Sequence, residues 1–379
     1  MLRRQGETGI HVHMATFLDE LRSRGYPVVF VNHLSAFKFL GLPIFGVRRI
    51  VDRINGSLSV AWYVFWHLWF LRVALRARLR GLGPAVVYAQ CPISARAALD
   101  ARRSRDQPVV MVVHFIHSLG DEWVAKGKIP DGGRVHRWIS RLEGRTLPEV
   151  DGIVFLSRYM RDYLEARNPG LESVTSLVLP NFISPAPAVP EERLEADLIT
   201  IGALDRNKNQ GYILRVLVEA ATLGRSYSLT IVGDGPERAS QEAQVRASGL
   251  SGRVRFLGYR AHARSLLPAH RAYVHAARMD NFPMVVLEAL AAGLPVLAPA
   301  VAGIPEMITD GVEGVMWPLD DPRDAAQRLI ELLEDEPRRR RMGAAAERRF
   351  AADFQTSVVV DRLIQFLTTL EPMTAHTDR

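Results

Sequence analysis

Short apolar segments alternate with amphipathic segments along the whole chain. The apolar segments are rich in Val, Ile and Leu and are bounded by Gly, Pro or polar residues, as is typical of buried strands. They are YPVVFVN, AVVYAQ, PVVMVVH and GIVFLS in the first half, and DLITIG, LTIVG, RVRFLG, AYVHAA and LPVLAPA in the second. Strands that alternate with helices predict an α/β protein with parallel sheets.

One segment interrupts this alternation. Residues 183–196, ISPAPAVPEERLEA, are rich first in proline and then in charge, which is typical of a linker. The chain of 379 residues is long enough for two domains. We expect an N-terminal domain at 1–182 and a C-terminal domain at 197–350, with a helix at 355–371 that packs back on the first domain. Doubly wound sheets bind ligands beyond the carboxyl ends of their strands, so two facing Rossmann-like domains would form a cleft between them.

The segment DNFPMVVLEALAAG predicts a buried helix. Asn281 is a suitable N-cap, Pro283 suits the first turn and Gly293 suits the end. Between them, residues 284–292 are apolar on every side except at Glu288, so we expect the helix to be buried.

A carboxylate in an apolar helix needs partners, because burying an unpaired charge is unfavourable. For Glu288 these are either a structural ion pair or backbone contact, or a ligand with hydroxyl groups. Asp280 lies just before the helix start, and Glu288 lies about 8 Å further along from that start at 1.5 Å per residue. Helix starts also bind anions. A ligand with hydroxyls at both ends and phosphates in the middle, such as a nucleotide sugar, would fit this arrangement.

Two other loops follow predicted strands of the second half. LTIVGDGPERA places Gly233 and Gly235 after a strand, but Arg238 stands where a dinucleotide-binding fingerprint has its third glycine. These glycines would still let a ligand approach the backbone. ITIGALDRNKNQ places Arg206 and Lys208 in the loop after the strand DLITIG. These two basic side chains are either a solvated charge cluster or a contact for phosphate.

In the first half, His114 directly follows the apolar strand PVVMVV, and His117 lies nearby. A histidine in this place is either a polar neighbour with a structural role or a catalytic group. No His/Cys spacing predicts a zinc site. The single cysteine, Cys91, excludes a disulfide framework and favours a reducing compartment.

The composition is that of a soluble globular protein, with 48% hydrophobic and 23% charged residues. The start, MLRRQGETGIHVH, has no apolar core after its arginines, so we do not expect a secretory signal. The net charge of +7 favours acidic ligands, either phosphates or an anionic membrane surface.

The most hydrophobic segment is residues 58–75, LSVAWYVFWHLWFLRVAL. It barely reaches the length of a membrane span and is interrupted by polar residues, so a buried or surface-lying amphipathic helix is the favoured interpretation. Arg72, Arg76 and Arg80 recur at helical spacing. The tryptophans of this segment serve either core packing or contact with a membrane interface.

The segment from Asp280 to Glu288 resembles the Glu-x7-Glu motif of the retaining, nucleotide-sugar-dependent glycosyltransferases of family four, which have the GT-B fold. Here the first glutamate is replaced by aspartate. The resemblance covers nearly the whole chain and is strongest over 197–320. It implies that Glu288 holds the ribose hydroxyls. It also implies that the transferred sugar and the phosphates are held by Asp280, Asn281, Phe282, Pro283, Met284 and Val285.

The same resemblance assigns further residues. Lys208 matches the family's phosphate-binding lysine, whereas the arginine that accompanies it falls at Ala203, so Arg206 would substitute for it. His114 matches a histidine at the donor sugar. TGIHVH resembles the first glycine-rich loop, with the amide of Gly9 facing the β-phosphate. GDGP and VRFLGYR match segments that border the nucleotide base.

One feature departs from the family. The family begins with a short strand before its glycine-rich loop, and here only MLRRQGE precedes that loop. Either this strand is vestigial or the native start lies upstream. Loss of a central strand would reduce the stability of the first domain.

The sequence therefore predicts a retaining hexosyltransferase that uses a UDP- or GDP-sugar and a hydroxyl acceptor, in polysaccharide, glycolipid or glycosylated-metabolite biosynthesis. The predicted catalytic residues are His114, Lys208 and Asp280. No Asp-x-Asp follows a strand, so we expect no metal and no other cofactor. The acceptor would be soluble or lipid-linked. We expect the protein to be cytoplasmic, either free or peripheral on the inner face of the membrane. We expect no nucleic-acid partner. Two alternatives remain open, a non-catalytic GT-B subunit and a nucleotide-sugar epimerase.

Overall fold

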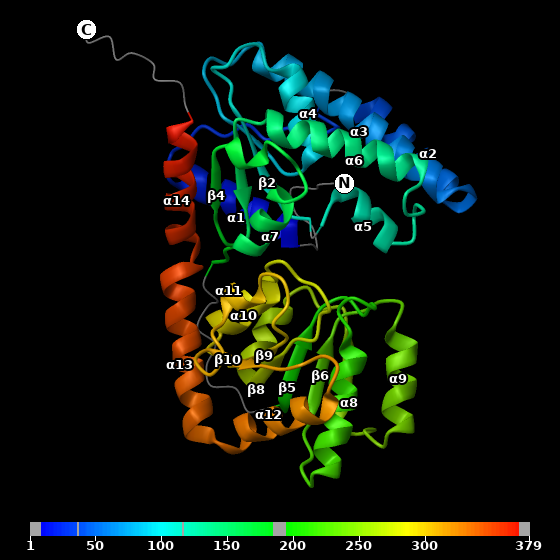
Figure 1. Ribbon diagram of the computed structural model, residues 1–379, viewed down its shortest axis with the longest axis vertical. Helices are drawn as coiled ribbons and strands as arrows, with labels where there is room; N and C mark the ends of the chain where they lie inside the picture. Colours follow the sequence, from blue (N-terminus) through cyan, green and yellow to red (C-terminus); the bar gives the residue numbers. More distant parts are fainter. Residues whose placement is uncertain (1–8, 36–37, 116, 185–194, 371–379) are drawn as a thin grey trace. The chain divides into compact units, whose positions relative to one another are not determined.

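The computed structural model describes residues 9–35, 38–115, 117–184 and 195–370 (Figure 1). By its internal contacts the chain forms two compact units. The first contains Leu21–Leu179 and the described residues from Val360 onward, and the second contains Pro180–Val359. Helix α1 (Gly9–Ser23) starts in the second unit and enters the first after Glu20. The chain thus changes units inside α1, after Leu179 and inside α14 (Thr356–Thr369). Most of the expected linker lies outside the described residues.

The first unit is built on a parallel four-stranded sheet in the order β1-β2-β3-β4. Its strands are β1 (Val87–Ala89), β2 (Val109–Val113), β3 (Gly152–Phe155) and β4 (Ser176–Val178). The central strands β2 and β3 are buried along their whole length, which explains their continuous apolar sequence. The helices of this unit are α2 (Lys38–Ile54), α3 (Gly56–Leu79), α4 (Pro92–Ala101), α5 (Leu119–Ala125), α6 (Arg134–Thr146), α7 (Arg158–Glu165) and most of α14.

The strand expected for YPVVFVN, residues 26–32, was wrong. This segment is not in a strand, although Val31 packs on the core of the unit. The apolar pattern of a strand is present, but a strand also needs a neighbour with which to form a hydrogen-bonded ladder. Within the described residues, none pairs with it. The strand that the family resemblance places before Gly9 lies outside the described residues.

The second unit is built on a six-stranded parallel sheet in the order β10-β9-β8-β5-β6-β7. Its strands are β5 (Ala196–Ile201), β6 (Leu229–Val232), β7 (Val254–Gly258), β8 (His270–Val274), β9 (Val296–Ala298) and β10 (Gly314–Met316). Numbered from β5, this is the strand order 3-2-1-4-5-6 of the Rossmann fold. The order reverses between β5 and β8, which makes the carboxyl ends of these two strands the expected ligand site.

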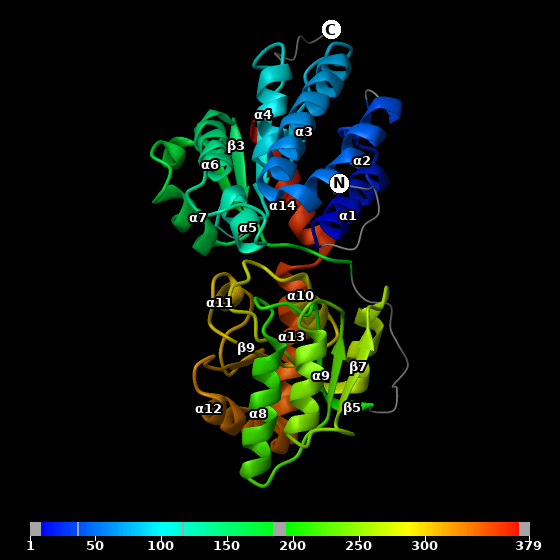
Figure 2. The same ribbon diagram turned by 90° about the vertical axis from the view of Figure 1, so that its right-hand side faces the viewer.

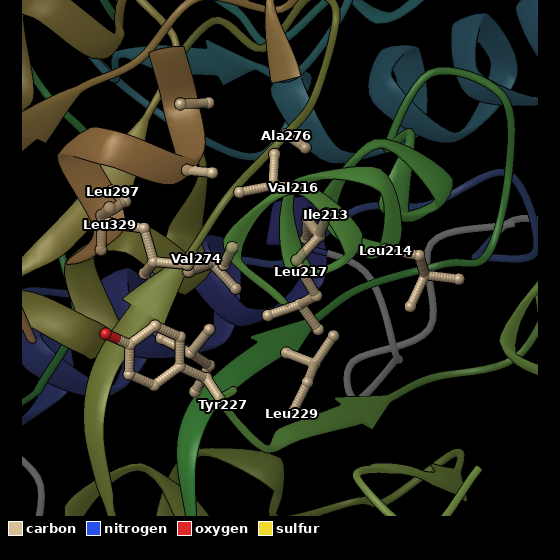
Figure 3. Close-up of a cluster of buried hydrophobic side chains, with 14 of the residues drawn as sticks. Ile213, Leu214, Val216, Leu217, Tyr227, Leu229, Val274, Ala276, Leu297 and Leu329 are labelled. Atoms are coloured by element: carbon tan, nitrogen blue, oxygen red, sulfur yellow. The ribbon is translucent and has the colours of Figure 1, made fainter. Parts of the chain in front are cut away.

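The helices of the second unit cover this sheet. They are α8 (Gln210–Thr222), α9 (Arg238–Ala247), α10 (Met284–Ala291), α11 (Ile304–Met307), α12 (Pro322–Glu334) and α13 (Glu336–Asp353). Helix α8 packs against both α9 and α12. Its residues Ile213, Leu217 and their neighbours lie in one apolar cluster with Leu229, Val274 and Leu297 of the strands (Figure 3). Each such buried side chain contributes about 1.5–3 kcal/mol, so this core fixes the strand ends from which the site loops emerge.

Candidate nucleotide-sugar site

The site of the second unit begins with an ion pair between two loops. Lys208 lies in the loop after β5, and Asp280 lies beyond the end of β8. The Nζ atom of Lys208 is 2.5 Å from Oδ2 of Asp280. Their side chains are 27% and 13% exposed, so the pair is sheltered but accessible from one side. The two residues meet at the point where the strand order reverses.

Asparagines on either side of Lys208 hold the two loops together. Asn207 donates through Nδ2 to the carbonyl of Met279 at 2.9 Å. The backbone carbonyl of Asn207 accepts a hydrogen bond from the backbone amide of Arg278 at 2.8 Å. Asn209 donates through Nδ2 to the carbonyl of Ala276 at 3.2 Å. Asn209 has a φ of 55°, a left-handed conformation that asparagine tolerates better than most residues. Sequence reasoning missed both asparagines, because their partners lie far along the chain.

His275 is a further site residue that the sequence analysis missed. It directly follows β8, and its Nε2 atom lies 3.5 Å from Oδ2 of Asp280. Burial lowers the pKa of His275, although the Asp280 carboxylate opposes this shift. Its carbonyl accepts a hydrogen bond from Nε1 of Trp317 at 3.0 Å. The position directly after a strand, which singled out His114, was the available signal.

Asp280 is held as an anion. Its burial alone would raise the pKa, but Lys208 and His275 outweigh this effect and lower the pKa to about 2. The carboxylate therefore carries its charge throughout the neutral range and can accept hydrogen bonds from ligand hydroxyls.

The start of α10 differs from the expectation. The N-cap is Pro283, not Asn281, and the N-cap residue provides no side-chain hydrogen bond to the helix. The physical reason is the proline itself, which disfavours helical backbone at the preceding residue, Phe282, so the helix cannot begin before it. Phe282 is fixed instead by Asn181, whose Nδ2 atom donates to its carbonyl at 2.8 Å. The uncapped amides of Met284 and Val285 lie at the positive end of the helix dipole.

Glu288 lies one turn into α10, and its side chain makes no hydrogen bond or ion pair with any residue that the structure describes. Burial raises its pKa to about 7, and the more distant charge of Arg264 only partly opposes this. Of the two interpretations of Glu288, the structural ion pair is therefore wrong for the described residues. A mostly buried carboxylate without a protein partner is suited to bind ligand hydroxyls.

Gly233 and Gly235 have a structural reason to be glycine. Gly233 has a φ of 140°, and a Cβ atom there would lie 1.9 Å from the carbonyl oxygen of Gly202. A Cβ atom on Gly235 would lie 2.4 Å from the carbonyl oxygen of Leu204. Both glycines thus let the loop after β6 pack directly on the loop that leads to Lys208. Their direct effect is on the shape of the site.

The structure describes three further predicted site residues separately. Arg206 has a side chain that is 95% exposed, and its nearest acidic group is Glu237, at 3.8 Å. Gly9 is the first residue of α1, so it begins a helix. His114 belongs to the first unit, where its Nε2 atom lies 3.0 Å from Oε1 of Gln90. Within the described residues, no group of three or more His, Cys, Asp or Glu side chains is placed to hold a metal ion.

A Rossmann sheet with an anion-binding helix start and two acidic residues at its switch point defines a nucleotide-binding α/β protein. Comparison with known families makes this specific. Residues 8–186 match the model of Glycosyltransferase Family 4, and residues 188–349 match that of Glycosyl transferases group 1. The chain belongs to the family-four glycosyltransferases of the GT-B fold.

Individual relatives agree with this assignment. The chain is 26% identical over 322 residues to a glycogen synthase of Mycobacterium tuberculosis, covering 82% of this chain and 76% of the relative. It is 29% identical over 340 residues to the alpha-D-kanosaminyltransferase of Streptomyces kanamyceticus, covering 85% of this chain and 86% of the relative. The crystal structure of Anabaena HepE in complex with UDP and glucose has the same fold, with a TM-score of 0.62 at 18% identity, over 79% of this chain and 81% of that one.

Proposed function

We propose that this glycosyltransferase transfers a hexose from a UDP- or GDP-sugar to a hydroxyl acceptor with retention of the anomeric configuration. The observation that carries the proposal is the set of three features on one unit: the Lys208–Asp280 pair, the uncapped start of α10 and the unpartnered Glu288. Lys208 and the helix amides can bind phosphates, and the two carboxylates can bind hydroxyl groups. A nucleotide sugar presents both kinds of group, with its phosphates between the hydroxyls of the sugar and those of the ribose.

In the proposed reaction the bond between the sugar C1 and the phosphate oxygen breaks, and negative charge builds on the leaving nucleoside diphosphate. Lys208 and the amides of Met284 and Val285 stabilise this charge. The acceptor oxygen attacks C1 on the face that the diphosphate leaves, and a phosphate oxygen takes the acceptor's proton. Because the same face is used, the configuration at C1 is retained and no protein nucleophile is required.

Asp280 and Glu288 would hold the two ends of the donor. Asp280, anionic and adjacent to Lys208, accepts hydrogen bonds from hydroxyls of the transferred sugar. Glu288 accepts from the ribose hydroxyls, which gives its buried carboxyl the partners that the protein does not provide. His275 and Asn207 keep Asp280 and the lysine loop in place.

The family resemblance supports three further assignments in the proposal. His114 contributes to binding the donor sugar, the amide of Gly9 faces the β-phosphate, and Arg206 assists Lys208. The high exposure of the Arg206 side chain means that it would have to move toward the phosphates when the donor binds. We propose that the reaction needs no metal ion, since the lysine and the helix start supply the positive charge.

A panel of donors tests the proposal. UDP-glucose, UDP-N-acetylglucosamine, UDP-galactose and GDP-mannose are first compared by thermal shift, and the donor that stabilises the protein is then supplied in labelled form. The proposal predicts transfer of label to a hydroxyl acceptor and an unchanged anomeric configuration in the product, read by NMR. Release of nucleoside diphosphate without any acceptor would indicate an epimerase, and binding without turnover of any donor a non-catalytic subunit.

A further inference from the structure

Helices α2 and α3 of the first unit carry an exposed apolar surface that the proposed donor site does not use. The two helices pack side by side (Figure 2). The exposed apolar residues on them are Val47, Ile50 and Ile54 of α2 and Leu58, Phe65 and Trp69 of α3. We call these six residues the docking face. Ile54 is 80% exposed, and Leu58 and Phe65 are 55% and 54% exposed, which is unusual for side chains of this size.

The spacing of these residues places them on one side of each helix. In α3, Leu58, Phe65 and Trp69 are seven and four residues apart, so they lie within one stripe at 3.6 residues per turn. The opposite side of α3 is buried: Val60, Val64, Leu71, Leu75 and Leu79 lie in the apolar clusters of the unit. The helix therefore has two apolar sides, of which one is buried among the described residues and the other keeps Leu58, Phe65 and Trp69 40–55% exposed.

Charge around the docking face is strongly positive. Residues 38–80 contain eight basic side chains and one acidic one, Asp52, whose carboxylate is neutralised by Lys128 at 2.7 Å. Arg76 and Arg80 continue the α3 stripe beyond Trp69, and both are exposed. Neither makes an ion pair with a described residue. Arg76 donates only to a backbone carbonyl, that of Asp100, at 3.2 Å. An apolar stripe with aromatic residues that ends in arginines without acidic partners is complementary to an anionic lipid surface.

Helix α3 is also long and apolar enough to cross a membrane, the one such helix among the described residues. Its packing argues against a span. Nine of its residues are buried, including Ser59 and His67, and Arg72 forms an ion pair with Asp100 of α4. Crossing a bilayer would require α3 to leave this core and expose the apolar faces of α4 and the sheet to water.

We propose that the docking face binds the surface of an anionic membrane, with Phe65 and Trp69 inserted at the level of the headgroups and Arg76 and Arg80 in contact with lipid phosphates. The chain would then be a peripheral membrane protein that lies on the bilayer through α2 and α3. This inference is independent of the identity of the donor.

Co-sedimentation of the full chain with vesicles tests this inference. Vesicles of phosphatidylcholine alone are compared with vesicles that also contain phosphatidylglycerol, at low and high salt. We expect binding to the anionic vesicles only, and weaker binding as salt rises. Phe65→Ser combined with Trp69→Ser should weaken binding at least about tenfold, since apolar insertion is lost. Arg76→Gln combined with Arg80→Gln should weaken it about twenty-five-fold, at about fivefold for each arginine.

Matched controls come from the second unit. Tyr259→Ser combined with Val312→Ser removes two exposed apolar residues, and Arg246→Gln combined with Arg253→Gln removes two exposed arginines. Both control pairs should bind vesicles as the unchanged protein does. Thermal unfolding of every variant shows whether the fold is retained.

Three results would overturn the inference. The first is failure to co-sediment with anionic vesicles at low salt. The second is the combination of two observations: sedimentation equilibrium shows a dimer that the Phe65→Ser, Trp69→Ser variant abolishes, and the same variant binds vesicles as the unchanged protein does. A second copy of the chain would then cover the docking face. The third is resistance of the bound protein to extraction at alkaline pH, which would indicate a membrane span.

Discussion

The Nζ atom of Lys208 lies 2.5 Å from Oδ2 of Asp280, although 72 residues separate the two in the chain. The Rossmann strand order explains this contact, because β5 and β8 are neighbours in the sheet and their loops leave it at the same edge. In the proposed function the pair combines a cation for phosphate with an anion for sugar hydroxyls at a single point. The predictions below separate these two roles.

Asp280→Asn should lower kcat moderately. The amide keeps the shape of the side chain but loses the negative charge, which Lys208 and His275 stabilise and which accepts hydrogen bonds from sugar hydroxyls. Those contacts change as the sugar ring flattens toward an oxocarbenium ion, so part of the loss should appear in kcat and part in KM. Steady-state kinetics with the preferred donor measure both. An unchanged kcat and KM would show that Asp280 only anchors the lysine loop.

Glu288→Gln should raise the KM for the donor and leave kcat less affected, because ribose hydroxyls do not change during the reaction. The pKa of Glu288 in the free protein is about 7, and its ionised form is the better acceptor. Donor affinity of the unchanged protein should therefore increase as pH rises through about 7 and then level off. Calorimetric titrations across this range should show this increase, and the Gln variant should lack it. The same pH dependence in both proteins would contradict the assignment.

Glu288 should also affect stability in the absence of donor. Its pKa is raised from 4.5 to about 7 on folding, so folding favours the protonated carboxyl. The sign follows from linkage: its ionisation destabilises the folded state progressively as pH rises from about 4.5 to about 7, and no further above that. Relative to the unchanged protein, Glu288→Gln should therefore gain thermal stability over this interval. A difference in melting temperature that is constant with pH would exclude this effect.

Gly233→Ala should destabilise the second unit by about 3 kcal/mol or more, from its positive φ and from the overlap with the carbonyl of Gly202. Gly211→Ala is the matched control in the same unit, since its added methyl would meet only the flexible end of Gln244, at 3.2 Å. Chemical unfolding of the two variants measures the difference. Equal stabilities would show that the loops after β5 and β6 do not pack as described.

Transfer activity should survive removal of divalent metal. Lys208 and the start of α10 supply positive charge at the proposed diphosphate position, which is the role that a metal has in other nucleotide-sugar enzymes. The measurement is turnover in excess EDTA, with and without later addition of Mg²⁺ or Mn²⁺. Complete loss in EDTA with recovery on adding metal would show that the prediction is wrong.

Much of the second unit could be predicted from the sequence, because its signals are local. Buried strands, the helix beginning near Pro283 and its end at Gly293 follow from runs of apolar residues and from the backbone preferences of Pro and Gly. The strands β4 and β10 were missed because each has only three residues and, unlike the equally short β1 and β9, neither was singled out by a longer apolar segment such as AVVYAQ or LPVLAPA. Such short segments carry little periodicity.

The rest depends on contacts between distant parts of the chain. The sequence singled out Lys208 and Asp280 separately, but their contact requires the strand order. The roles of Asn207 and His275 appear only once the loops after β5 and β8 are placed together. The glycines after β6 were interpreted as room for a ligand, whereas their first requirement is room for the backbone of Gly202 and its neighbours.

The central claim is that Lys208 stabilises charge on the leaving diphosphate, and single-turnover kinetics of Lys208→Ala test it most directly. Removing one such charge-stabilising donor is expected to raise the barrier by about 2.7–4 kcal/mol, which is about a hundredfold to thousandfold in the chemical step. Arg206→Ala, with its exposed side chain, should have a much smaller effect. Thermal unfolding confirms that each variant is folded. A chemical step in Lys208→Ala that is as fast as in the unchanged protein would contradict the account.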